Sequence, residues 1–167
     1  MTGKCHLNGI AKIGQQGGRG MYKKILVPLD GSEFSEQVLT HVRAISLGFQ
    51  VPEVVLLIVV KPIDNSEIIA NMGDEWVREI TKQEQIKAEG YIGKVADDLA
   101  KDGIAAQSMV LVGSPAHEIL EYITNNQIDL VIMGTHGRSG PSRWVLGSAT
   151  DRVSKHSKAP VLIVRTE

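Results

Sequence analysis

From Met21 onward, short apolar segments alternate with longer segments in which apolar residues recur every three or four positions. The short segments are KKILVPLD (residues 23–30), VVLLIVV (54–60), SMVLV (108–112), DLVIMG (129–134) and PVLIVR (160–165). Because they are rich in Val and Ile and are bounded by turn residues, we expect strands rather than helix fragments. Their apolar residues are continuous rather than alternating, which predicts strands covered on both faces.

Helical patterns fill the spaces between these strands. The first follows Ser32, a candidate N-cap, and its apolar residues are Phe34, Val38, Val42 and Ile45. Residues 66–101 carry two apolar stripes and predict one bent helix or two, with Trp76 as a packing residue. The first stripe is Ile69, Met72, Trp76 and Ile80, and the second, after Gly90, is Ile92, Val95 and Leu99. Later helices are expected from Ser114-Pro115 and from about Gly147 to a point before Pro160.

This order of elements, βαβαβαβαβ, predicts an α/β fold: a single five-stranded parallel sheet with helices on both faces. In sheets of this kind, ligands bind beyond the carboxyl ends of the strands, where the strand order reverses. We therefore expect functional residues immediately after the strands.

Asp30 follows the first strand in the sequence PLDGS. A carboxylate there can accept hydrogen bonds from sugar hydroxyls or bind a metal ion. Alternatively, Asp30 simply helps to cap the next helix. Gly113, after the third strand, is interpreted as a turn residue.

The fourth strand leads into GTHGRSGPSRWVLGS, residues 134–148, which contains four glycines, two arginines and no acid. Glycine lets a polyanion approach backbone N–H groups, and the start of the following helix adds free amides and partial positive charge. Ser148 would add a hydroxyl, and His136, Arg138 and Arg143 a positive potential. The alternative is a glycine-rich connector that binds nothing.

Several other classes are disfavoured. There is no P-loop sequence, no G-x-G-x-x-G after the first strand, and no acid cluster of the receiver type. With 18 basic against 19 acidic residues and 4% aromatics, nucleic-acid binding is not expected. The longest apolar run is too short to cross a membrane, and the single Cys5 suits a reducing, cytoplasmic location.

Residues 1–20 form a glycine-rich segment with no acidic residue and precede the patterned sequence. We interpret this segment as a leader that is disordered or that derives from cloning or a mis-assigned start. A functional arm is the alternative. The folded domain is expected to span residues 21–167.

Three segments resemble the universal stress protein family: KKILVPLDGSEFSEQVL, DLVIMGTHGRSG and LGSATDRVSKHSKAPVLIV. The resemblance runs from about Met21 to Arg165. The spacing of Gly134, Gly137 and Gly147-Ser148 matches the G-2x-G-9x-G-[S/T] signature of the ATP-binding branch. This resemblance implies a Rossmann-like fold of the adenine nucleotide alpha hydrolase type with strand order 3-2-1-4-5.

The resemblance also assigns residues to the nucleoside end of an ATP site. Pro28 and Asp30 would line this end, with Asp30 near the ribose. Val59 would lie against the adenine, and Met133 would close the fourth strand beside it. For Val59 and Met133, the alternative is ordinary core packing.

At the phosphate end, the resemblance and the charge pattern together imply contacts along the phosphate chain. The residues are Gly134, His136, Gly137, Arg138, Gly147, Ser148 and Ala149. Gly134 would approach the ribose or α-phosphate, and the helix start would receive the β- and γ-phosphates. Ala149 stands where valine is frequent in the family.

The favoured function is an ATP-binding regulatory protein of the stress response, with or without Mg²⁺, and with little or no fast hydrolysis. No well-placed Glu, Gln or Asp follows the glycine loop, and this absence disfavours fast turnover. The alternatives are a slow ATPase or nucleotidyl-transfer enzyme and a dimeric module that binds no nucleotide. An apolar final strand, from Pro160 to Arg165, predicts an exposed edge, and the resemblance implies a homodimer through it.

Overall fold

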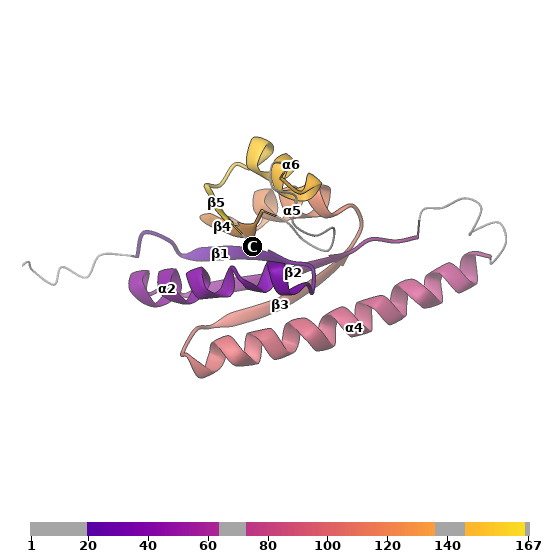
Figure 1. Ribbon diagram of the computed structural model, residues 1–167, viewed down its shortest axis with the longest axis horizontal. Helices are drawn as coiled ribbons and strands as arrows, with labels where there is room; N and C mark the ends of the chain where they lie inside the picture. The colour runs from indigo at the N-terminus through magenta and orange to yellow at the C-terminus, as the bar shows by residue number, and fades with distance from the viewer. Residues whose placement is uncertain (1–19, 64–72, 136–145, 166–167) are drawn as a thin grey trace, which may run out of the picture.

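The computed structural model describes residues 20–63, 73–135 and 146–165. Five parallel strands form one sheet in the order β3-β2-β1-β4-β5 (Figure 1). The strands are β1 (Lys24–Leu29), β2 (Glu53–Val60), β3 (Ala106–Val112), β4 (Leu130–Gly134) and β5 (Val161–Val164). The predicted fold class and strand order are confirmed.

Helices cover both faces of the sheet. The described helices are α1 (Glu33–Glu36), α2 (Leu39–Phe49), α4 (Asp74–Lys101), α5 (Pro115–Asn125) and α6 (Ser148–His156). In Figure 1, α2 and α4 lie on one side of the sheet, and α5 and α6 lie on the other. None of these helices combines the length and apolarity that a membrane crossing requires.

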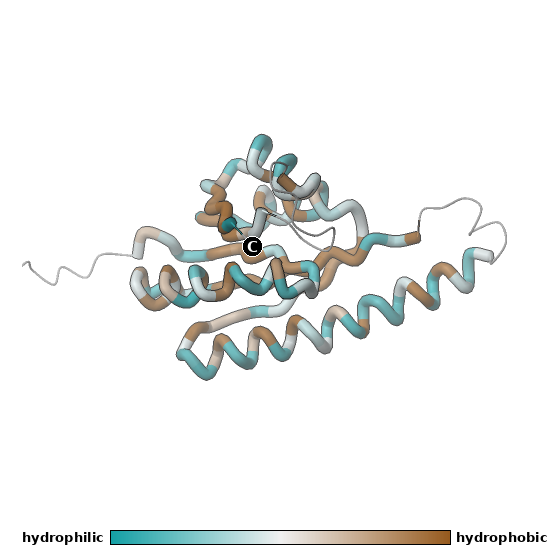
Figure 2. Tube along the Cα trace, viewed as in Figure 1, coloured by the Kyte–Doolittle hydropathy of each residue, from teal (hydrophilic) through white to brown (hydrophobic). Residues whose placement is uncertain are grey.

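Two hydrophobic clusters hold these layers together, and successive residues of the central strands alternate between them. Leu56 packs in the cluster that contains Val42 and Leu99 of the α2/α4 layer. The next residue, Leu57, packs in the cluster that contains Ile119 of α5. Since strand side chains point to opposite faces in turn, burial on both faces requires the continuous apolar runs that the sequence shows (Figure 2).

The two edge strands are covered less completely. Along β3, the side chains of Gln107, Ser108, Met109 and Val112 are exposed. In β5, the residues from Val161 to Ile163 are half-buried. The expectation that every strand is covered on both faces is therefore wrong for β3: α4 packs on one face, and Gln107 and Met109 on the other face are exposed.

The helical region after β1 is divided. Ser32 caps α1 as predicted, its Oγ accepting a hydrogen bond from the Ser35 amide at 3.2 Å. The chain then turns at Gln37 and Val38 before α2 begins, so one predicted helix is two.

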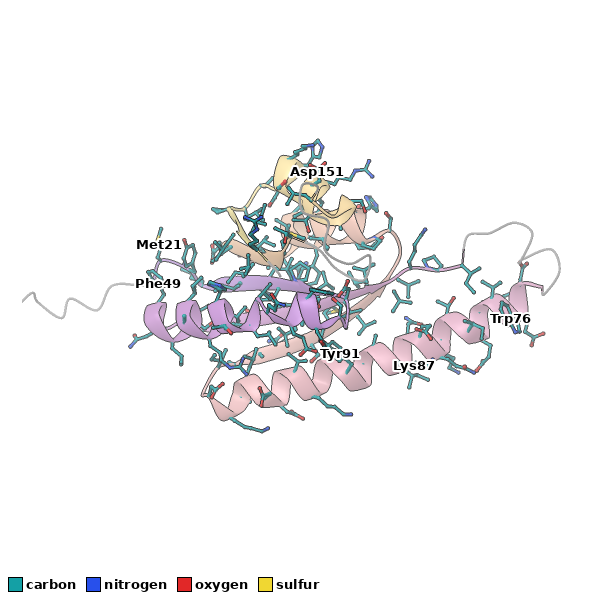
Figure 3. All side chains as sticks on the ribbon, in the orientation of Figure 1. Met21, Phe49, Trp76, Lys87, Tyr91 and Asp151 are labelled. Atoms are coloured by element: carbon teal, nitrogen blue, oxygen red, sulfur yellow. The ribbon has the colours of Figure 1, made fainter. Side chains whose placement is uncertain are left out.

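The long polar segment forms one helix over its described part. With 28 residues, α4 is about 42 Å long, and its amino-terminal half extends beyond the sheet (Figure 1). Ile92 and Leu99 are fully buried, as the second stripe predicts. Trp76, however, is 37% exposed at the far end of α4 (Figure 3), so its interpretation as a packing residue is wrong. Residues Ile69 and Met72 of the first stripe lie outside the described residues.

Two isoleucines of α4 provide a matched test of this packing. Replacing the fully buried Ile92 with Ala should lower the free energy of unfolding by about 2–5 kcal/mol, because a cavity is left behind. The same change at Ile86, which is 58% exposed, should cost less than about 0.5 kcal/mol. Urea unfolding measures both values, and equal losses in the two variants would contradict the described packing of α4.

Candidate nucleotide site

The carboxyl ends of β1 and β4 mark the point where the strand order reverses. From β1 the sheet continues through β2 to β3 on one side and through β4 to β5 on the other. β1 and β4 pair only at Ile25 with Leu130 and at Leu26 with Val131, whereas β1 pairs with β2 up to Leu29. The predicted site residues at the ends of β1 and β4 therefore flank this reversal, where open α/β sheets bind ligands.

The candidates for the nucleoside end share one face of the sheet. Val59 and Met133 both pack with the cluster beneath α5 and α6. Pro28 follows Leu26 by two residues along β1, and Leu26 belongs to that same cluster, so Pro28 turns to the same face. Met133 is 4% exposed and contributes to the core, whereas Val59 is half-buried. The structure thus brings three of these residues to one face, as a shared base-binding surface requires.

Asp30 is held in a tight turn at the end of β1. Its Oδ1 accepts hydrogen bonds from the Ser32 amide at 3.0 Å and from the Ser32 hydroxyl at 2.6 Å. The Ser35 hydroxyl in turn donates to the Ser32 carbonyl at 2.9 Å. These bonds show that Asp30 orders the cap of α1. This is the role that the sequence analysis gave as the alternative to binding a ligand. The role of Asp30 at a ribose remains a prediction.

The start of α6 lies directly beyond the end of β4. The Gly147 amide donates to the Thr135 carbonyl at 2.8 Å, and the buried Thr150 hydroxyl donates to the Gly134 carbonyl at 2.8 Å. These two bonds fix the amino end of α6 against the strand end. The predicted helix start is confirmed, since Gly147 is the N-cap and Ser148 the first helical residue.

The first turn of α6 presents backbone amides. The helical ladder begins with the Asp151 amide, which donates to the Gly147 carbonyl at 2.9 Å. The preceding amides, of Ser148, Ala149 and Thr150, therefore have no acceptor within the helix, and Gly147 has no side chain to cap them. Asp151 is the acid of this turn, and Lys155 pairs with it at 2.8 Å. Partial positive charge at this end favours an anion.

The remaining phosphate-end candidates are less completely defined. His136, Gly137 and Arg138 lie outside the described residues, so their roles stay predictions. Gly134 is buried, and its carbonyl accepts a hydrogen bond from Thr150, so its contact with a ligand stays a prediction.

Sequence reasoning missed two residues that shape this site. Thr150 lies at the third position of the helix after the glycine loop, and only its fixed spacing from Gly147 could have indicated its role. Tyr91 donates a hydrogen bond from its phenol to Glu36 Oε1 at 2.8 Å, across 55 residues of sequence. Burial, the hydrogen bond to Glu36 and the charges of Glu36 and Asp30 raise the pKa of Tyr91. No local signal in the sequence could have predicted this pairing.

Gly113 follows β3 directly and precedes α5, which agrees with its interpretation as a turn residue. The side chain of Glu118, in the first turn of α5, lies close to the Cα of Gly113. Within the described residues, no group of acids, histidines or cysteines could hold a metal ion.

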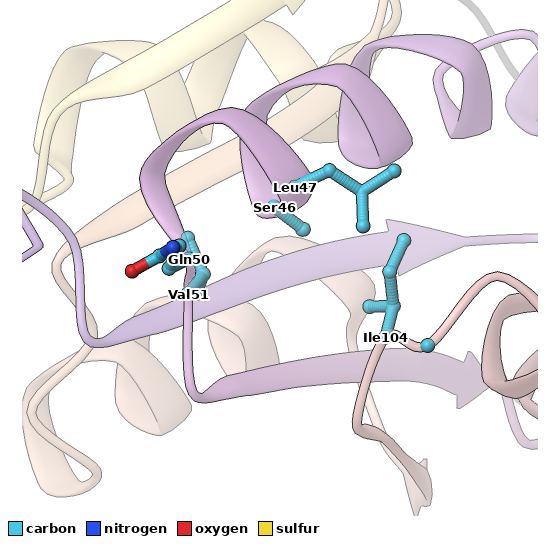
Figure 4. A pocket seen from close by; sticks show the side chains of 6 residues that line it. Ser46, Leu47, Gln50, Val51 and Ile104 are labelled. Carbon is cyan, nitrogen blue, oxygen red and sulfur yellow. The ribbon is translucent and has the colours of Figure 1, made fainter.

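A cavity of about 420 Å³ lies elsewhere in the molecule (Figure 4). Its lining residues are Ser46, Leu47, Gln50, Val51, Gly103 and Ile104. They belong to the segments that lead into the amino ends of β2 and β3. This cavity is therefore at the opposite edge of the sheet from the carboxyl ends, and it is not part of the candidate site.

Comparison with known proteins identifies the family. The sequence model of the Universal stress protein family matches residues 21–165, and the chain therefore belongs to this family. Universal stress protein MJ0531 of Methanocaldococcus jannaschii is 34% identical over 148 residues, which cover 89% of this chain and 85% of that protein. Universal stress protein MJ0577 of the same organism is 33% identical over 159 residues, which cover 87% of this chain and 96% of that protein.

Solved structures share the fold. The structure of MJ0577 matches with a TM-score of 0.74 over 88% of this chain and 98% of that chain. UspA from Lactobacillus plantarum matches with a TM-score of 0.75 at 25% identity, covering 86% of this chain and 98% of that chain. A universal stress protein solved in complex with cAMP has a TM-score of 0.56 at 22% identity, covering 87% and 98%. A family protein of Arabidopsis thaliana solved with AMP bound has a TM-score of 0.62 at 16% identity, covering 87% and 92%.

The bond between Thr150 and Gly134 gives a testable consequence. Replacing Thr150 with Val keeps the shape but leaves the buried Gly134 carbonyl without this donor, which should cost about 1–3 kcal/mol of unfolding free energy. Thr124 makes the same kind of bond to the Leu120 carbonyl on an exposed surface, so its replacement by Val should cost less than about 0.5 kcal/mol. Denaturant unfolding of both variants compares them. A Thr150→Val variant as stable as Thr124→Val would refute the proposed anchoring of α6.

Proposed function

We propose that this protein binds ATP, with or without Mg²⁺, at the carboxyl ends of β1 and β4. It acts as a nucleotide-dependent regulatory protein of the stress response and not as a fast hydrolase. The observation that carries this proposal is the position of the α6 amino end. Hydrogen bonds to Thr135 and Gly134 hold its first-turn amides beside the strand end, where a phosphate chain would meet them.

The chemistry of the described residues fits such a ligand. Phosphate oxygens accept hydrogen bonds from the amides of Ser148 and Ala149, and the exposed Ser148 hydroxyl adds a further donor. The base would lie on the face shared by Pro28, Val59 and Met133. The family members solved with cAMP and with AMP support an adenine nucleotide as the ligand class. The glycine spacing supports the ATP-binding branch.

Binding without fast turnover agrees with the acids of the site. Hydrolysis needs a group that orients or activates the attacking water. Two described acids lie at the candidate site: Asp30 accepts hydrogen bonds from Ser32, and Asp151 pairs with Lys155. These contacts give both carboxylates roles in ordering the starts of α1 and α6. A slow ATPase or nucleotidyl transferase remains the second candidate, and single-turnover hydrolysis separates it from a binding protein.

The edge strand β5 supports a homodimer. The carbonyls of Pro160 and Val164 accept hydrogen bonds from the β4 side of the sheet. Because successive residues of a strand turn their N–H and C=O groups to opposite sides, Val161 and Ile163 turn theirs away from β4. Val161 and Ile163 are half-buried residues with apolar side chains. Their outward N–H and C=O groups are suited to pairing with β5 of a second copy.

The ATP site is tested by a glycine substitution in the loop. Wild-type protein at an ATP concentration about 100 times its Kd should gain roughly 2.7 kcal/mol of stability. A Gly137→Val variant should fold but gain nothing, because the added side chain blocks close approach of the phosphates. Calorimetric titration and thermal unfolding measure the effect.

The control for this experiment is Gly90→Val in α4, where an added side chain meets open space. This variant should bind ATP as the wild type does. Unchanged affinity in Gly137→Val would remove the glycine loop from the proposed site. A wild type without any ATP-dependent stabilisation would leave the non-binding module as the function.

The dimer is tested by removing one outward amide. Ile163→Pro deletes the N–H that faces away from β4 and keeps the β4–β5 hydrogen bonds, so the protein should fold as a monomer. Ile163→Val keeps the amide and should remain a dimer. Solution scattering at micromolar concentration gives the mass of each variant, and a dimeric Ile163→Pro protein would exclude pairing through β5.

A further inference from the structure

We propose that Tyr91 is a positioning residue for the nucleotide site. Through its hydrogen bond to Glu36, Tyr91 holds α1 and thereby fixes the turn that contains Asp30. This inference rests on the proposed function, because its consequence for binding depends on Asp30 contacting the ribose. It names a residue of α4, outside the strand ends at which the ligand would bind.

The connection consists of two links at opposite ends of α1. At the carboxyl end of this single turn, Glu36 Oε1 accepts the phenol proton of Tyr91 at 2.8 Å. At the amino end, Ser32 donates its amide and its hydroxyl to Asp30 Oδ1. Figure 3 shows Tyr91 midway along α4, below α2 and the sheet. A shift of α1 would therefore move the partner of Asp30.

A helix of four residues is poorly stabilised by its own hydrogen bonds. Forming one helical turn fixes several residues for a single ladder bond, so isolated turns are unstable in water. In α1, the Glu36 amide donates to the Ser32 carbonyl at 3.2 Å and the Gln37 amide to the Phe34 carbonyl at a long 3.4 Å. External contacts must hold this turn in place, and α1 contacts both β1 and β4 at the reversal of strand order.

The hydrogen bond between Tyr91 and Glu36 links α4 to α1. Tyr91 is half-buried, and burial, Glu36 and Asp30 all raise its pKa, so the phenol remains protonated and able to donate at neutral pH. The effect of Asp30 also indicates that its charge lies within electrostatic reach of the phenol. Removing the hydroxyl would leave the half-buried Glu36 carboxylate without this donor.

The first experiment needs no nucleotide. Tyr91→Phe should speed amide hydrogen exchange at Ser32 and Ser35 by about three- to tenfold, since the bonds of both amides depend on a fixed α1. Tyr122→Phe makes the same chemical change on α5, beneath the opposite face of the sheet, and should leave that exchange unchanged. Unchanged exchange in Tyr91→Phe would overturn the positioning role.

The second experiment compares ATP with 2′-deoxy-ATP. Tyr91→Phe should weaken ATP binding about three- to tenfold and should reduce the preference for ATP over 2′-deoxy-ATP. General loss of stability would weaken both ligands equally, so equal weakening would overturn the inference. Glu36→Gln combined with Tyr91→Phe should weaken ATP binding no more than the stronger single variant, because both act through one bond.

The two experiments separate the inference from the function on which it rests. If the wild type binds no adenine nucleotide, the proposed function is wrong, while the exchange data still decide whether Tyr91 fixes the Asp30 turn. If the wild type binds ATP and Tyr91→Phe changes neither exchange nor the ligand preference, the role of Tyr91 is wrong and the proposed function stands.

Discussion

Burial of the central strands on both faces is the constraint on which the rest of this structure depends. Residues such as Leu56 and Leu57 pack into different clusters, one beneath α2 and α4 and the other beneath α5 and α6. A parallel sheet can meet this requirement only if each crossover carries a helix back over one face or the other. That connectivity sends every strand in the same direction and gathers the residues that follow them at one edge.

The attachment of α6 to the sheet places backbone donors at the candidate site. Hydrogen bonds of Gly147 to Thr135 and of Thr150 to Gly134 hold the start of α6 beside the end of β4, which is buried between β1 and β5. The first-turn amides of α6 have no acceptors within the helix, as at the start of any helix. The site's donors are thus a consequence of how the helix is attached to the sheet, and they need no charged side chain within the described residues.

The sequence predicted those features that depend on local pattern. Continuous Val and Ile runs indicated the buried strands, and the glycine spacing indicated the start of α6 at Gly147. Features that depend on where elements pack could not be predicted in this way. Trp76 fits an apolar stripe, but α4 extends past the sheet, and the stripe has no strand beneath it there. The pairing of Tyr91 with Glu36 joins residues far apart in sequence, and no periodicity records it.

The two faces of the sheet contribute differently to the proposed site. The residues proposed to contact the base and the phosphates belong to the α5/α6 side, whereas the Asp30 turn is linked to the α4 side through Tyr91 and α1. Between these parts, β1 and β4 share no pairing beyond Leu26 and Val131. A nucleotide that contacts Asp30 and the start of α6 would therefore join two layers where the sheet itself does not. Since a ligand stabilises the state to which it binds better, a bound nucleotide would stabilise α1 and its contact with α4 as well as the start of α6. The proposed regulatory role would use this link between the ligand and a distant surface.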